Sequence, residues 1–209
     1  MTEDIVKKML ESGVHIGHRN CFWNPKMFQF IYCKRRRVHI IDLDKTIRMF
    51  KKALLFVERL VVEDKHILFV CTKWQLQSFV EKEVSRISMS FITKRWLGGT
   101  LTNFNTISSS PLSLDVSKKA KGFKINRVPD AVVVVEAVKH RIVIREAQRL
   151  RVPVIAIVDT NCSLSGISFP IPANDDSATA VHLILAGIIK HIHKTKCLKE
   201  KAAKLGING

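Results

Sequence analysis

Buried strands and amphipathic helices alternate along the chain. Residues 66–71, 131–135 and 154–158 are almost entirely apolar, which predicts strands covered on both faces, and 89–92 predicts a weaker strand. Apolar residues recur at helical spacing over 75–87, over 142–150 and from Asp176 to about Lys194, which predicts three helices. Such alternation predicts an α/β fold, a parallel sheet with helices on both faces.

The N-terminal part has a less regular pattern. A short amphipathic helix is predicted over 2–11, and a mixed polar, aromatic and basic stretch over 12–37 predicts an extended or looping arm. A strand is predicted over 38–43, followed by a helix with Asp42 or Asp44 as its cap. We therefore expect an N-terminal helix and arm over 1–37 and an α/β domain over 38–194.

Two segments do not fit the alternating pattern and look like solvated or RNA-facing appendages. Residues 108–128 are serine-rich and then basic, so we expect a basic loop over 105–128 within the α/β domain. The end of the chain is rich in lysine, and we expect a separate tail over 195–209.

The charge balance indicates a polyanionic partner. The 209 residues include 35 Lys and Arg against 18 Asp and Glu, a formal net charge of +17. A globular chain this basic usually binds nucleic acid, and an anionic membrane surface is the weaker alternative. None of the five cysteines stands in a CxxC pair, which favours a reducing compartment. No apolar run has the length of a membrane span. We expect no secretory signal, and a transit peptide that is absent or already removed.

Acidic residues follow two of the predicted strands and raise the question of catalysis. Asp159 follows the strand over 154–158, and Asp175 and Asp176 precede the last helix. At the carboxyl ends of strands such groups could hold a metal or polarise a substrate. They also satisfy turn backbone and cap helices, and we favour that reading.

Cofactor and metal signatures are weak. Gly98-Gly99 is not followed by a phosphate-binding glycine pattern, and no GxSxG nucleophile motif is present. His15, His18 and Cys21, with Cys33 and His39 further on, lack the paired spacing of a structural zinc site. We therefore predict no catalytic residue, no cofactor and no metal.

Basic residues interleaved with aromatic ones give the stronger signal. Arginine forks match phosphate oxygens, and aromatic rings stack on unpaired bases, so these clusters predict RNA contacts without sequence-specific readout. The candidate RNA-binding residues are His15, His18, Arg19, Trp23, Asn24, Lys26, Lys34, Arg35, Arg36, Arg37, Lys73, Lys94, Arg95, Trp96, Asn103, Lys118, Lys119 and Lys121.

Five ordered motifs resemble a known family. They are Gly13-Val14-His15-Ile16-Gly17-His18 with Trp23-Asn24-Pro25-Lys26-Met27; His39-Ile40-Ile41-Asp42-Leu43 with Lys45-Thr46; Arg95-Trp96-Leu97-Gly98-Gly99-Thr100-Leu101-Thr102-Asn103; Val128-Pro129-Asp130; and Pro153, Asp159-Thr160-Asn161-Cys162 and Pro172-Ala173-Asn174-Asp175-Asp176. In this order they are similar to the universal uS2 family of small-ribosomal-subunit proteins, bacterial and organellar. The resemblance runs from about Val6 to Lys190.

The resemblance implies a flavodoxin-like domain without catalysis. It implies a place on the solvent side of the small subunit, between head and body, in contact with rRNA and neighbouring ribosomal proteins, and not as a homo-oligomer. In bacteria that neighbourhood helps hold the messenger-gathering S-one protein. Asp159 and Asn174-Asp175-Asp176 then become scaffold features.

One departure bears on the source. Bacterial members carry a long charged helical hairpin, and the segment from Phe104 to Pro129 is too short for one. Mitochondrial members lack or shorten it, so we expect a mitochondrial ribosome, with a plastid or the bacterial cytoplasm as alternatives. The alternative function is an α/β enzyme acting on an anionic or nucleotide substrate through Asp159 and Asp175.

Overall fold

A central sheet with a flavodoxin-like strand order organises the protein. The computed structural model describes residues 2–104, 123–125 and 127–204. Within them the sheet runs β6 (Phe123–Lys124), β5 (Ser90–Ile92), β4 (Ile67–Val70), β7 (Ala131–Val134), β8 (Val154–Val158) and β9 (Phe169–Pro172), with all neighbours parallel except β6 and β5. Numbered along the chain, the five parallel strands lie in the order 2-1-3-4-5, the flavodoxin-like arrangement. The predicted α/β fold is confirmed.

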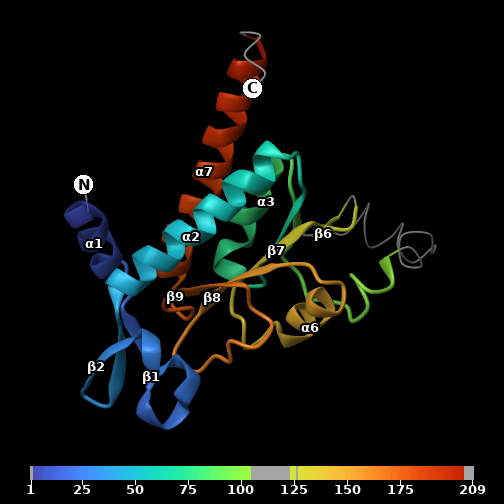
Figure 1. The fold of residues 1–209 in the computed structure, drawn as a ribbon. Coiled ribbons are helices and arrows are strands. Elements are labelled where there is room, and N and C mark those ends of the chain that lie inside the picture. The colour runs from blue at the N-terminus through green and yellow to red at the C-terminus, as the bar shows by residue number, and fades with distance from the viewer. Residues whose placement is uncertain (1, 105–122, 126, 205–209) are drawn as a thin grey trace.

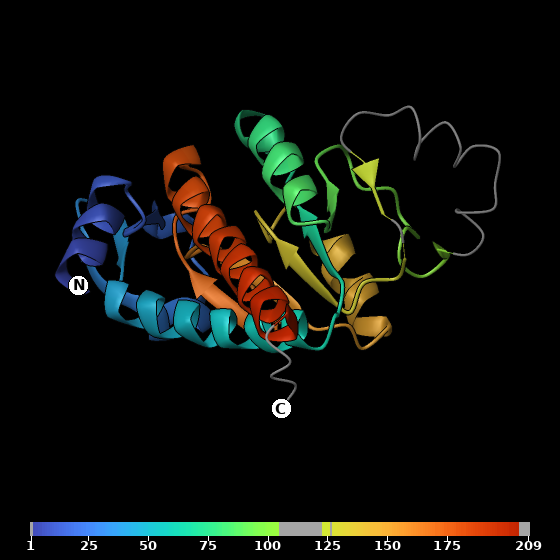
Figure 2. The same ribbon diagram turned by 90° about the horizontal axis from the view of Figure 1, so that it is seen from above.

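Helices cover both faces of this sheet. On one face lie α2 (Leu43–Val62), α3 (Gln77–Arg86, preceded by the 3-10 turn η3, Trp74–Leu76) and α7 (Ala178–Lys204). Viewed from above, α7 lies between α2 and α3 (Figure 2). On the other face lies α6 (Arg141–Arg149), across the sheet from α2 (Figure 1). The strands have both faces covered, which is why their sequences are apolar throughout.

Alternate strand residues enter two separate cores. Phe69, Val133 and Ile157 pack beneath α2, α3 and α7, whereas Leu68 and Val132 pack beneath α6. Each of these side chains is at most 1% exposed. Burial of this kind contributes about 25 cal/mol per Å² of apolar surface, so the two cores supply most of the driving force for folding.

The predicted cap of α2 is confirmed. The Asp42 carboxylate accepts hydrogen bonds from the backbone N–H groups of Asp44, at 3.1 Å, and Lys45, at 3.4 Å. These donors lie in the first turn and have no partner inside the helix. An Asp at this position therefore fixes the start of α2.

The segment over 12–37 is not a free arm. After α1 (Thr2–Glu11), β1 (Ile16–Arg19) and β2 (Ile31–Arg35) flank β3 (Val38–Ile41) in a small antiparallel sheet, with the 3-10 turns η1 (Asn20–Phe22) and η2 (Pro25–Phe30) between them. Met27 and Phe30 are buried in the core beneath α6. The strand expected over 38–43 thus pairs with residues of the expected arm. The sequence pattern did not reveal this because short strands with one exposed face are polar at many positions.

Two further expectations are corrected at the C-terminal end. The last helix starts at Ala178, and the Ser177 hydroxyl accepts the hydrogen bond of the Ala180 N–H at 3.3 Å, so Ser177 and not Asp176 caps it. The helix also continues to Lys204, so residues 195–204 of the expected tail are helical, and 205–209 lie outside the described residues. Lys196 and Lys199 anchor this part of α7 to the rest of the protein. Their ammonium groups donate hydrogen bonds to the backbone carbonyls of Ile87 and Val62, respectively.

Strand β9 and part of the expected basic loop also differ from the pattern. The sequence Phe169-Pro170-Ile171-Pro172 gives no strand signal, because prolines cannot donate to a ladder, and β9 tolerates them at the edge of the sheet. Phe123 and Lys124, which fall within the expected loop, form β6 beside β5. Residues 105–122 and 126 of that loop lie outside the described residues.

Gly17 on β1 lies close to Thr160, the second residue after β8. A Cβ atom here would lie 2.6 Å from the Thr160 methyl carbon and 3.1 Å from the His39 carbonyl oxygen. We expect Gly17→Ala to lower the free energy of unfolding by about 1–3 kcal/mol through overpacking, measured by urea denaturation. Gly98→Ala is the control, since a Cβ there meets nothing within 4 Å. Equal effects of the two substitutions would contradict the close approach.

Candidate nucleic-acid interface

Acidic side chains close one half of the carboxyl edge of the sheet. Asp159 follows β8 and Asp175 follows β9, and the two residues are only 1% and 5% exposed. The Asp159 carboxylate accepts hydrogen bonds from the backbone N–H groups of Thr160 and, at 3.4 Å, Asp175. Its Oδ2 also lies 3.1 Å from Nδ1 of His18, which β1 brings to this edge. The predicted turn role of Asp159 agrees with this geometry.

Burial and mutual repulsion shift the protonation of this cluster. The hydrogen bond to Asp159 raises the pKa of His18 from 6.5 to about 8, so the imidazole is largely protonated near neutral pH. Burial, together with the charges of Asp159 and Asp176, raises the pKa of Asp175 to about 7. Lys73 adds a further positive charge, since its Nζ donates to the Asp175 carbonyl at 2.8 Å and lies 3.6 Å from Glu136. The cluster is thus balanced by the protein's own cations.

The same cluster contains the strongest candidate metal ligands among the described residues. His18, Asp175 and Asp176 offer ligand atoms within 4.8 Å of one another. The His18 ring already bridges two carboxylates, with Nδ1 3.1 Å from Asp159 and Nε2 3.3 Å from Asp176, so a divalent cation would compete with this pairing. The cluster therefore links β1 to the segments that follow β8 and β9.

The other half of the edge depends on a buried glutamate that the sequence did not single out. Glu146 on α6 is 6% exposed, and its carboxylate accepts three N–H donors, from the Trp96 indole at 3.1 Å, Gly99 at 2.7 Å and Leu101 at 2.9 Å. These hydrogen bonds satisfy a buried charge without a cation. The Arg95–Asn103 motif is thereby fixed on α6, and Trp96 is 8% exposed, part of the core and not an open stacking surface.

A basic hollow lies at the outer end of the small sheet. Arg19, Lys34, Arg36 and Arg37 line a depression of about 730 Å³, and all four side chains are exposed. None of the residues lining it is acidic. This "hairpin hollow" brings together four of the predicted RNA-binding residues from two strands and the turn between β2 and β3.

Exposed aromatic rings lie on β2 and on the 3-10 turns η1 and η2 that connect β1 to β2. Phe22, Phe28 and Tyr32 are 65%, 72% and 75% exposed, whereas Phe30 is buried. These three residues are not among the predicted RNA-binding residues, because the local sequence does not show which aromatic side chains are exposed to solvent. Their only sequence signal is their position among basic residues. Rings presented beside arginines are typical of surfaces that bind unpaired bases.

The remaining predicted residues divide into anchored and accessible groups. Trp23 packs against His39 with ring centroids 5.2 Å apart, and the Asn24 side chain caps η2 by accepting from the Lys26 N–H. His15 is half-buried, and Lys26, Arg35, Lys94, Arg95 and Asn103 are exposed. Lys118, Lys119 and Lys121 lie outside the described residues.

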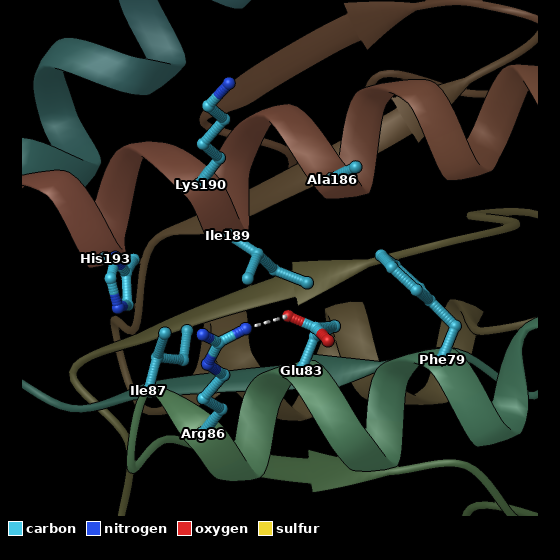
Figure 3. Close-up of a pocket in the computed structure, with 8 residues that line it drawn as sticks. All are labelled: Phe79, Glu83, Arg86, Ile87, Ala186, Ile189, Lys190 and His193. Atoms are coloured by element: carbon cyan, nitrogen blue, oxygen red, sulfur yellow. Dashed lines mark ion pairs between the residues drawn. The ribbon is translucent and has the colours of Figure 1, made fainter.

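A further pocket lies between α3 and α7 (Figure 3). Its volume is about 320 Å³, with Phe79, Ile87 and Ile189 forming apolar walls. At its rim Glu83 and Arg86 pair with each other at 3.8 Å, drawn as a dashed line in Figure 3. Lys190 and His193, both exposed on α7, complete its polar lining.

Among the helices of the described ranges, none has both the length and the apolar content that crossing a bilayer requires.

The fold and the site define a class: a basic α/β protein whose strand-end carboxylates serve the scaffold. Comparison with known proteins agrees. The family model described as "Ribosomal protein S2" matches residues 9–124 and 115–195, and the chain belongs to this family. It is a structural constituent of the small ribosomal subunit and not an enzyme, so the alternative of catalysis through Asp159 and Asp175 is wrong.

Several bacterial relatives, each named small ribosomal subunit protein uS2, cover most of the chain. The protein from Dictyoglomus turgidum is 37% identical over 234 residues, which is 98% of this chain and 95% of the relative. The protein from Koribacter versatilis is 36% identical over 231 residues, 97% of this chain and 77% of the relative. The protein from Karelsulcia muelleri is 37% identical over 216 residues, 90% of this chain and 97% of the relative.

Glu146 provides a test of how the Arg95–Asn103 motif is held. In Glu146→Gln an amide N–H₂ must face one of the three N–H donors, so we expect the free energy of unfolding to fall by about 1–3 kcal/mol. Glu83→Gln on α3 is the control: Glu83 is partly exposed and, among the described residues, pairs only with the exposed Arg86, so the change in stability should be no more than about 0.5 kcal/mol. Urea denaturation of both variants measures the difference. An unchanged Glu146→Gln protein would exclude the anchoring role.

The acidic cluster predicts that stability depends on pH. His18 has a folded-state pKa above its unfolded value of 6.5, so its contribution is complete below pH 6.5 and is lost as the pH rises through about 8. The raised pKa of Asp175 acts in the same direction at lower pH, reducing stability as the pH rises from 3.8 to about 7. We expect the free energy of unfolding to fall by about 1 kcal/mol across pH 6.5–8.5 on account of His18.

Denaturation at several pH values, on the wild type and on His18→Gln, measures this dependence. His18→Gln should flatten the decline above pH 6.5, whereas His193→Gln, at an exposed position on α7, should leave it in place. An unaltered slope in His18→Gln would show that another group is responsible.

Proposed function

We propose that the small antiparallel sheet is the main RNA-contacting surface of this ribosomal protein. The observation that carries the proposal is the hairpin hollow, where four cations and no carboxylate line one depression. Arg35 extends the cationic surface, and exposed rings come from β2 (Tyr32) and from the turns between β1 and β2 (Phe22 and Phe28). Guanidinium groups bind phosphate oxygens in a bidentate manner, and exposed rings stack on unpaired bases.

Backbone strain in the hairpin supports a binding role for its turn. Arg36 and Arg37 form the two-residue turn between β2 and β3, and both have positive φ, 48° and 66°. Such turns favour Asn-Gly, because a left-handed conformation costs an ordinary L-residue about 1–2 kcal/mol. Two arginines there sacrifice stability, which is expected where side chains are needed for contact.

The cationic side chains act in this proposal as phosphate contacts that position the protein. Lys94 and Arg95, exposed after β5, form a second cationic site, and neighbouring ribosomal proteins are the other partners we propose. The chain acts as a single copy in the subunit. We further propose a mitochondrial subunit, which the short segment from Phe104 to Pro129 and the lysine-rich end of the chain support.

Replacing the strained turn separates stability from binding. We expect Arg36→Asn/Arg37→Gly to raise the free energy of unfolding by about 1 kcal/mol, because the new residues suit positive φ. The same variant should bind small-subunit rRNA more weakly, and the slope of log affinity against log salt should fall by about 0.7–0.9 for each phosphate that the variant no longer neutralises. Filter binding across salt concentrations and urea denaturation give the two readouts. A variant that is more stable and binds as well as the wild type would refute the proposed role of the turn.

Cationic clusters should differ in their contribution to assembly. We expect Lys34→Gln/Arg35→Gln and Lys94→Gln/Arg95→Gln to reduce incorporation into small subunits more than Lys194→Gln/Lys201→Gln on α7. The wild-type affinity for RNA should fall by about 10³–10⁵ between 50 and 200 mM salt if six to ten phosphates are neutralised. A larger loss from the α7 pair, or an affinity insensitive to salt, would contradict the proposal.

Density-gradient sedimentation of the tagged protein with small subunits measures incorporation and also tests the location. Recovery with mitochondrial subunits supports the mitochondrial proposal. Recovery with plastid or bacterial subunits alone would overturn the location and leave the RNA surface standing.

A further inference from the structure

An open pocket lies at the switch point of the main sheet. Strand order reverses between β4 and β7, and the segments that follow β4, β5 and β7 surround a cavity of about 440 Å³. Its walls include Thr72, Lys94, Arg95, Lys139, His140 and Ile142, with Trp96 and Val143. In open α/β sheets the crevice at this position is the usual place for a ligand. This "switch-point pocket" is separate from the acidic cluster at β8 and β9.

The pocket is cationic, in contrast to the adjoining half of the edge. Lys94, Arg95 and Lys139 line it, and no carboxylate does. Lys139 is paired with Glu136, whereas Lys94 donates to the neutral Gln77 amide, at 3.3 Å. Among the described residues neither Lys94 nor Arg95 forms an ion pair. Two cations therefore remain available for an anionic group.

The inner walls of the pocket combine apolar surface with neutral polar groups. The Thr72 hydroxyl lies 3.0 Å from Nε2 of His140, and burial lowers the pKa of His140, so this pair is uncharged near neutral pH. Ile142 and Val143 from the first turn of α6 add apolar surface. Trp96 is held in place through Glu146, so this wall is rigid.

We propose that the switch-point pocket binds one nucleotide, with its phosphate on Lys94 and Arg95 and its base among Thr72, His140 and Ile142. A cavity of 440 Å³ is within the range of small-ligand sites, about 300–1,000 Å³. A nucleotide combines an anion with a flat, partly apolar ring that has polar edges, which matches both parts of the lining. An extruded nucleotide of single-stranded or looped RNA and a free mononucleotide share this chemistry.

The inference rests on the proposed RNA-contacting function and makes it more specific. Duplex RNA presents its phosphates on an outer surface and keeps its bases stacked, so a pocket at the sheet edge favours an unpaired nucleotide. An acidic peptide would pair with the cations, but its carboxylates would make no favourable contact with the neutral polar and apolar inner walls. RNA is therefore the ligand that the lining fits best.

A pocket-filling substitution with a matched control tests the proposal. Ile142 is 54% exposed at the start of α6, so Ile142→Trp fills the pocket without changing charge, and Leu150→Trp, at a 40% exposed position just after the same helix, adds the same side chain elsewhere. Lys94→Gln/Arg95→Gln removes the anion contacts, with Lys82→Gln/Arg149→Gln as the charge-matched control. The probes are a labelled single-stranded oligoribonucleotide, an RNA duplex, adenosine monophosphate, inorganic phosphate and a polyglutamate peptide.

We expect Ile142→Trp to weaken single-strand binding about tenfold and to leave duplex binding unchanged, as is typical when one base no longer stacks on the protein. Adenosine monophosphate should compete with the single strand on the wild type better than phosphate does, and not on Ile142→Trp. If the mononucleotide binds in the pocket but the single strand is unaffected by Ile142→Trp, the free nucleotide is the ligand.

Equal behaviour of Ile142→Trp and Leu150→Trp with every probe would overturn the pocket, as would competition by polyglutamate equal to that of the mononucleotide. If Ile142→Trp does not fold, the comparison of the two charge variants decides, since only the pocket pair should lose mononucleotide competition. Wild-type protein that bound neither RNA would instead refute the proposed RNA surface. A failed pocket with duplex binding intact would leave that surface in place.

Discussion

The buried Asp159 carboxylate holds together parts of the chain that are far apart in sequence. It follows β8, accepts the Asp175 N–H from the segment after β9, and pairs with His18 of β1. A buried charge is costly unless it is paired and hydrogen-bonded, so each of these partners must be in place for the fold to be stable. The small sheet is consequently fixed against the main one, and the hairpin with its arginines projects in a defined direction. The orientation of the RNA surface that we propose depends on these contacts of Asp159.

The carboxyl edge of the sheet is divided between two uses. At β8 and β9 the protein fills it with its own histidine and lysine, so the residues that resembled a catalytic pair are structural. At β4, β5 and β7 the edge stays open, because Glu146 holds Trp96, Gly99 and Leu101 back against α6. The scaffold role and the cationic switch-point pocket therefore share one edge of the sheet. This is the position where related folds bind nucleotides.

Stability and binding oppose each other in the small sheet. Arg36 and Arg37 occupy a turn whose backbone favours Asn and Gly, and Phe28 and Tyr32 expose large rings to solvent. Each of these choices is unfavourable for an isolated fold and favourable for a surface covered by RNA. A ribosomal protein can tolerate this strained turn and these exposed rings, because binding within the ribosome stabilises the folded state.

Local sequence determined the elements whose signal is local. Continuous apolar runs predicted β4, β7 and β8, and Asp42 predicted the start of α2. The excess of lysine and arginine predicted a polyanionic partner. Tertiary structure decided the rest. Asn174-Asp175-Asp176-Ser177 offers four residues that can cap a helix, and Ser177 became the cap because His18 and Asp159 engage the two aspartates and their backbone. Trp96 is buried and Tyr32 exposed although both stand beside basic residues, because only packing determines which ring has a neighbour such as Glu146. The His18–Asp159 ion pair and the Trp96–Glu146 hydrogen bond join segments that are far apart in the sequence, so no local window contains both partners.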